Sequence, residues 1–198
     1  MKRFNVAAEI ILIFVIPVLV FYFELIPYGA RLAALEIFFA FVVLLAMARK
    51  MDFRRLGFRM DTFKASAKML IPLTVVGLVV LFIAYFNNIG TTYFFNEWWK
   101  NIYFLYYLIL GALTQEFGYR VFLLQRLRSI SYNKTFLLLS NSVLFALLHT
   151  LHRDWLILAG TFVFGMYLTW VYMKHPNILS STLAHGIVGA TAIILGFF

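Results

Sequence analysis

The chain is too apolar to be a soluble domain: of its 198 residues, 64% are hydrophobic, 19% are aromatic and only 13% are charged. A soluble domain of this length has too small an interior to bury so much apolar surface. The absence of cysteine excludes disulfides, thiolate catalysis and cysteine-ligated metals. The excess of 17 Lys and Arg over 8 Asp and Glu is typical of basic loops on one side of a membrane, so we expect no nucleic-acid partner.

Hydrophobic segments of roughly 20 residues, the length needed to cross a bilayer, recur along the whole chain. They cover approximately residues 6–27, 31–48, 66–87, 102–125, 135–152, 155–173 and 178–197. If the N-terminus is cytoplasmic, the inner loops hold thirteen Lys and Arg and the outer loops three. The sequence therefore predicts an all-α, polytopic membrane helix bundle of about seven transmembrane helices, with the N-terminus in the cytoplasm and one transmembrane domain over residues 1–198.

Four polar residues interrupt these apolar segments: Glu116 and Arg120 in one, His149 in the next and His185 in the last. A charge near the bilayer centre costs about 2.5–3.5 kcal/mol or more, so an intramembrane ionisable residue is a candidate functional residue. Glu116 and Arg120 are four residues apart, which places them on one face of a helix and predicts an ion pair. Gln115 lies beside Glu116, turned by about 100° around the helix axis.

These residues stand in three short motifs. Gln115–Arg120 (Q-E-F-G-Y-R) resembles the E-E-x-x-x-R motif of the CPBP intramembrane endopeptidases, the CAAX protease and bacteriocin-processing (Abi) family. Phe145–His149 (F-A-L-L-H) is similar to the F-x-x-x-H motif of this family, and His185–Gly189 (H-G-I-V-G) takes the place of its H-x-x-x-N/D motif. The order and spacing of the motifs fit over about residues 102–197, which we predict to be the catalytic core.

The resemblance implies metal-free hydrolysis of a peptide bond by a glutamate-activated water, with two departures from the motifs. Gln115 replaces the first glutamate, and Gly189 replaces the final Asn or Asp. A glutamine amide cannot usefully take up a proton, so either Glu116 activates the water or the chain is inactive. We favour Glu116 as the base, because both histidines are retained.

The resemblance also implies roles for the neighbouring residues. His149 is expected to orient the water or protonate the leaving amine, and His185 to donate a hydrogen bond to the oxyanion. Arg120 is expected to hold Glu116 in place. With Gly189 in the last motif, the second oxyanion donor is a backbone N–H, Asn141, Ser142 or no group at all. The residues predicted to line the substrate site are Phe145, Gly189, Asn141 and Ser142.

Two other interpretations remain open. His149, His185 and Glu116 are also a possible zinc ligand set with an open position, although there is no H-E-x-x-H motif. Alternatively, the chain is a degenerate relative that binds a peptide or acts as an immunity protein, since Gln115 and Gly189 remove polar groups that the chemistry would use. The favoured interpretation needs no cofactor. Its partners are the lipid bilayer and a peptide or protein cleaved close to the membrane, and the short chain favours a prokaryotic plasma membrane.

Overall fold

The computed structural model describes residues 3–87 and 105–197, and no strand is present in these ranges. Four helices are long and apolar enough to cross a membrane: Asn5–Tyr22, Phe63–Phe86, Lys134–His152 and Trp155–Lys174. Two shorter apolar helices cover Ala33–Ala48 and Ile178–Ile194. The predicted all-α class is confirmed, and an apolar helix lies within six of the seven predicted segments.

The remaining segment, predicted as a span over residues 102–125, differs from the prediction. Residues 102–104 lie outside the described residues, and residues 105–128 form one continuous helical stretch in which α-helical and π-helical turns alternate. Two π-helical stretches, η3 (Tyr107–Gly111) and η4 (Phe117–Leu123), enclose a five-residue α-helix, α6 (Ala112–Glu116). A π-helical turn closes its hydrogen bonds over one more residue than an α-helical turn, and such turns are frequent at functional sites. No uninterrupted α-helix of spanning length therefore forms here.

The chain folds into two compact units, each built from two stretches of sequence. One contains Met1–Asp52 and Gly118–Trp170, and the other contains Phe53–Phe117 and Val171–Phe198. The elements of the first unit are α1 (Arg3–Ile10), η1 (Ile11–Val15), α2 (Ile16–Tyr22), η2 (Tyr28–Ala30), α3 (Arg31–Ala48), most of η4, α7 (Leu124–Arg128), α8 (Lys134–Leu148), η5 (His149–His152) and most of α9 (Trp155–Lys174). The main elements of the second unit are α4 (Phe63–Phe86), η3, α6 and α10 (Ile178–Ile194).

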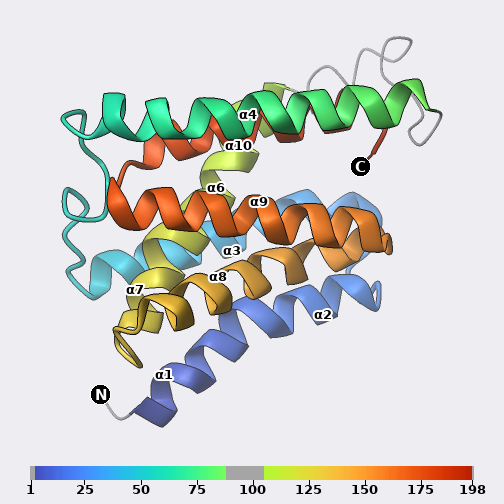
Figure 1. The fold of residues 1–198 in the computed structure, drawn as a ribbon. Helices are drawn as coiled ribbons and strands as arrows, with labels where there is room; N and C mark the ends of the chain where they lie inside the picture. The colour runs from blue at the N-terminus through green and yellow to red at the C-terminus, as the bar shows by residue number, and fades with distance from the viewer. Residues whose placement is uncertain (1–2, 88–104, 198) are drawn as a thin grey trace. The chain divides into compact units, whose positions relative to one another are not determined.

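In the second unit, α10 packs against α4 as well as against η3 and α6. Figure 1 shows α10 running alongside α4. Glycines allow both contacts to be close. A Cβ on Gly186 would lie 2.8 Å from the Leu108 carbonyl oxygen, and a Cβ on Gly77 of α4 would lie 3.2 Å from a methyl group of Val188. The backbone of α10 is thereby held close to the stretch that carries Glu116.

The loop before α4 is fastened to the start of α10 by Asn177, which is fully buried. Its side-chain oxygen accepts a hydrogen bond from the Ser180 backbone N–H at 2.9 Å, so Asn177 caps α10. Its side-chain nitrogen donates to the Arg59 carbonyl oxygen at 2.5 Å. The Thr62 hydroxyl donates to the Pro176 carbonyl oxygen at 2.7 Å. Part of the connection between the predicted spans 31–48 and 66–87 is thus bound to the helix that carries His185.

Charged residues link three elements of the first unit. The Glu9 carboxylate on α1 lies 2.6 Å from the Arg49 guanidinium, just after α3, and accepts a hydrogen bond from Arg126 of α7 at 3.0 Å. All three side chains are at least 74% buried. Two cations neutralise one carboxylate here, so the cluster keeps a net positive charge.

Candidate active site

The predicted site residues Glu116 and His185 meet within the second unit. Glu116 is the last residue of α6 and is fully buried, and His185 on α10 is 3% exposed. The Glu116 Oε1 atom lies 2.9 Å from the His185 Nδ1 atom. A buried carboxylate and imidazole at this distance form a pair in which a proton can be held or passed.

Tyr107 is a third member of this site, and sequence reasoning missed it. Its hydroxyl oxygen lies 3.0 Å from the His185 Nε2 atom. The two rings meet edge to face, with their centroids 6.1 Å apart. Tyr107 is one of eleven tyrosines and belongs to no motif, so only the close packing of η3 against α10 reveals it. Both ring nitrogens of His185 therefore have a hydrogen-bonding partner in the second unit.

The space beside Gly189 is taken by Tyr107. A Cβ on Gly189 would lie 2.4 Å from Tyr107 Cε1 and 2.7 Å from its hydroxyl oxygen. The sequence predicted that Gly189 admits a neighbouring helix or a substrate backbone beside His185. In the structure the ring of Tyr107, on η3, occupies this space. Gln115, the other departure from the motifs, is half-buried and lies close enough to the Tyr107 hydroxyl to interact with it.

His149 lies in the first unit, at the point where α8 passes into the 3₁₀ turn η5. Its Nδ1 atom is 3.0 Å from the Phe145 carbonyl oxygen, and the residue is 5% exposed. Because a carbonyl oxygen only accepts, Nδ1 carries a hydrogen, and the Nε2 atom of the neutral ring is the basic one. The meeting of His149 with Glu116 stays a prediction, since the two residues belong to different units.

Arg120 and Phe145 pack together in the first unit, and both are fully buried. The Arg120 guanidinium lies 4.4 Å from the centre of the Phe145 ring, and it donates to the Gly165 carbonyl oxygen at 3.5 Å. The Phe145 ring centroid is in turn 5.0 Å from that of His149. These contacts place Phe145 as packing for Arg120 and His149. The predicted pairing of Arg120 with Glu116 stays a prediction.

Asn141 and Ser142 are fully buried on α8, where their side chains are used for helix contacts. The Asn141 amide donates to the Tyr119 carbonyl oxygen at 2.6 Å and accepts from the Thr169 hydroxyl at 2.9 Å. The Ser142 hydroxyl donates to the Leu138 carbonyl oxygen of its own helix at 2.7 Å. These bonds join α8 to η4 and α9 within the first unit, and the predicted place of both residues in the substrate site stays a prediction.

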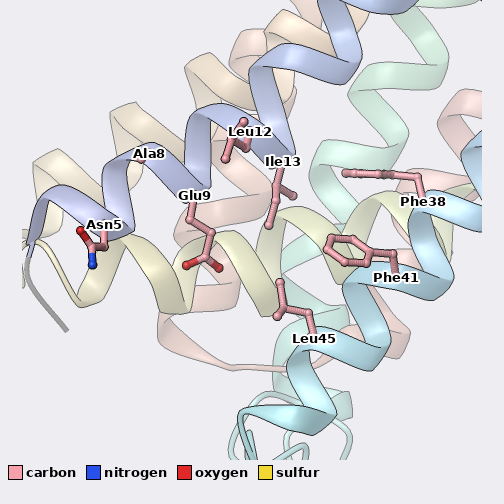
Figure 2. Close-up of a pocket in the computed structure, with 8 residues that line it drawn as sticks. All are labelled: Asn5, Ala8, Glu9, Leu12, Ile13, Phe38, Phe41 and Leu45. Carbon is pink, nitrogen blue, oxygen red and sulfur yellow. The ribbon is translucent and has the colours of Figure 1, made fainter.

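A hollow of about 530 Å³ opens elsewhere in the first unit, between the N-terminal helices and α3. Figure 2 shows the Glu9 carboxylate and Ile13 on one side of it and Phe41 and Leu45 on the other. Its single carboxylate is already paired with Arg49 and Arg126. The hollow therefore contains no carboxylate–imidazole pair comparable with that of Glu116 and His185.

No three histidine, aspartate or glutamate side chains form a group suited to a metal ion within either unit, as far as residues 3–87 and 105–197 are concerned. The zinc interpretation made from the sequence therefore has no three-ligand set inside a single unit. A reaction at this site therefore relies on the Glu116–His185 pair.

The comparison with protein families agrees with the motifs. The family described as "Type II CAAX prenyl endopeptidase Rce1-like" matches residues 97–191. Over these residues, just under half of the chain, the sequence is similar to the Rce1-like family. The matched stretch contains all three motifs, and the family is one of proteases. No curated protein and no solved structure matches the chain. The apolar helices and the family together make it an integral membrane protein.

Proposed function

We propose that the chain is an intramembrane endopeptidase that hydrolyses a peptide bond at or within the bilayer. The observation that carries the proposal is the buried contact of 2.9 Å between Glu116 Oε1 and His185 Nδ1, inside the stretch that matches the Rce1-like family. Glu116 is fully buried within an apolar stretch of the sequence, where a carboxylate is costly. A buried carboxylate in such surroundings is therefore expected to have a chemical function.

The proposed reaction needs no cofactor. The Glu116 carboxylate takes a proton from a water molecule while the water oxygen bonds to the scissile carbonyl carbon, and the carbonyl electron pair moves to its oxygen. When the electron pair returns, the C–N bond breaks and the leaving nitrogen receives a proton. We assign this proton delivery to a protonated His149, which gives up the proton on its Nε2 atom; the neutral ring then takes the proton held by Glu116 at the same atom, so that both groups return to their starting state. The products are a carboxylic acid and an amine.

His185 orients the base in this scheme. An ionised carboxylate only accepts hydrogen bonds, so His185 donates through Nδ1 to Glu116. Its Nε2 atom faces Tyr107. These contacts support an orienting role for His185 toward Glu116 more directly than the donation to the oxyanion predicted from the sequence.

The substrate is a peptide or protein whose cleavage site reaches the membrane, such as a leader, a C-terminal anchor or a lipidated tail. The enzyme itself resides in a prokaryotic plasma membrane in this proposal. Identifying the cleavage products in prokaryotic cells tests both the proposed substrate class and the proposed membrane.

The test compares the N- and C-termini of membrane proteins by mass spectrometry in cells that carry the wild-type chain, Glu116→Gln or His149→Ala. Glu24→Gln is the matched control, because its carboxylate is 65% exposed. We expect a set of new termini with the wild type and with Glu24→Gln, and none with the other two variants. Identical termini in all strains, with the proteins shown to be folded, would overturn the proposal in favour of a peptide-binding role.

A further inference from the structure

We propose that Tyr107 is a positioning residue for His185, and that Gly189 is required because it leaves the space in which Tyr107 reaches that histidine. The proposal deepens the proposed function and rests on it in one respect, namely that Glu116 is the ionised base. It concerns Tyr107, which the sequence analysis did not single out, and Gly189, which it placed only in the substrate site.

The direction of the hydrogen bonds follows from the chemistry of the three groups. An ionised Glu116 only accepts, so a neutral His185 carries its hydrogen on Nδ1 and a lone pair on Nε2. The partner at 3.0 Å from this lone pair is the Tyr107 hydroxyl, which must then donate. The chain of donors therefore runs from Tyr107 through His185 to Glu116.

These two hydrogen bonds hold the imidazole ring of His185 at both of its nitrogen atoms. If the ring of His185 turned over about its bond to Cβ, both nitrogens would leave their partners and carbon atoms would face Glu116 and Tyr107. His185 is 3% exposed, so water has little access to replace a lost partner. A buried polar atom without a partner is costly, so the two bonds together select one orientation of the ring. Tyr107 thereby keeps Nδ1 directed at the base.

Gly189 explains how the tyrosine comes so close. The hypothetical Cβ at this position overlaps Tyr107, since distances of 2.4 Å and 2.7 Å to its ring carbon and hydroxyl are far inside contact distance. Gly189 is four residues after His185, on the same face of α10. Any side chain at position 189 would push the tyrosine away from His185. Glycine is thus the residue that the Tyr107–His185 contact requires.

Gln115 fits the same arrangement. The hydrogen of the Tyr107 hydroxyl is used on His185, so a further partner of this oxygen has to donate to it. A glutamine side chain carries N–H donors, whereas an ionised glutamate carries none. Gln115 lies close enough to the Tyr107 hydroxyl to supply such a donor. The two departures from the family motifs, Gln115 and Gly189, therefore surround the same tyrosine.

The test uses the full-length chain labelled with ¹⁵N-histidine in lipid nanodiscs, with the His185 signals assigned by their loss in His185→Gln. In the wild type we expect a protonated Nδ1 and a hydrogen-bonded, unprotonated Nε2. In Tyr107→Phe, which removes a single oxygen atom, we expect the Nε2 signal to move to the position of a nitrogen without a hydrogen bond. The rate at which the new termini appear in cells should fall by up to about 100-fold, the loss expected when a catalytic group is misplaced by an ångström.

Gly189→Ala is the second variant, because it keeps the hydroxyl and displaces it. We expect the same change in the Nε2 signal and a similar loss of rate. Two matched controls separate this from general damage. Tyr172→Phe removes another tyrosine hydroxyl of the second unit, which donates to the Leu56 carbonyl oxygen, and Gly160→Ala adds a methyl group where no atom lies within 4 Å. Both controls should keep the wild-type Nε2 signal and the wild-type rate per folded molecule.

An unchanged Nε2 signal in Tyr107→Phe would overturn the proposal, and so would a changed signal with an unchanged rate of proteolysis. Absence of proteolysis in the wild type is a different result, because it refutes the proposed function. The Nε2 signals of Tyr107→Phe and Gly189→Ala would in that case still decide whether Tyr107 and Gly189 position His185.

Discussion

Replacing Asn177 by alanine should weaken the attachment of α10 to the loop that precedes α4. The substitution removes three hydrogen bonds of one buried side chain, the longest of which is a donation to the Thr62 hydroxyl at 3.4 Å. Of the other two, one caps α10 through the Ser180 N–H at 2.9 Å, and loss of such a cap costs about 1 kcal/mol. The other binds the part-buried Arg59 carbonyl oxygen at 2.5 Å, and leaving an acceptor of this kind without its donor costs about 1 kcal/mol or more. We therefore expect Asn177→Ala to lower the free energy of unfolding by about 2 kcal/mol.

Two comparison variants divide this loss into its parts. Asn177→Ser keeps a side-chain oxygen for the cap and loses the bond to Arg59, so it should cost about 1 kcal/mol. Asn133 caps α8 in the same way, through the Phe136 N–H at 3.0 Å, but from an exposed position. Asn133→Ala should therefore cost no more than the cap alone, about 1 kcal/mol.

The assay is equilibrium unfolding in mixed detergent micelles with increasing SDS, followed by circular dichroism and by the fluorescence of the four tryptophans. Equal losses in Asn177→Ser and Asn177→Ala would show that the cap contributes nothing. A loss below about 0.5 kcal/mol in Asn177→Ala, the usual range of surface substitutions, would refute the role of the Asn177 hydrogen bonds.

Three further changes test other parts of the structure. Gln115→Glu should lower the rate of proteolysis, because a carboxylate draws the Tyr107 hydroxyl hydrogen away from His185; new termini that appear only with Gln115→Glu would instead show that the natural chain is inactive. Gly165→Ala should lower the free energy of unfolding in SDS by about 1–3 kcal/mol, since its Cβ would lie 2.5 Å from a ring carbon of the buried Phe145. Hydrogen bonds from Arg59 lower the pKa of Asp61 from 3.8 to about 2, so the stabilisation from this pair is complete above pH 3.8 and is lost as the pH falls through about 2. An NMR titration should find this value and its return toward 3.8 in Arg59→Ala.

The helices were predictable because a bilayer imposes one strong requirement on a sequence. An apolar run of sufficient length must form a helix that satisfies its own backbone hydrogen bonds. This rule located six of the seven predicted segments. In the segment with Glu116 it predicted the helix but not the π-helical turns within it, on which hydropathy carries no information. Those turns depend on how the backbone packs against α10, which is a long-range contact.

The candidate site was predictable only in part, for the same reason. Glu116 and His185 could be found because ionisable residues are rare and costly in apolar segments. Tyr107 could not, because a tyrosine in an apolar, aromatic-rich stretch is unremarkable by composition. The attachment of the 53–62 loop to Asn177 was equally hidden, since it joins residues 115 and more positions apart.

The ion cluster of the first unit has a consequence for the order in which the protein is made. Glu9 and Arg126 are 117 residues apart in the chain. At elongation rates of about 5–20 residues per second, a ribosome needs about 6–23 s to pass from one to the other. During that interval Arg49 is the cluster's only cation within reach of Glu9. The N-terminal helices must therefore persist in the bilayer as a partly assembled intermediate, and a delay in translation between residues 49 and 126 would lengthen the time for which they are exposed to quality-control proteases.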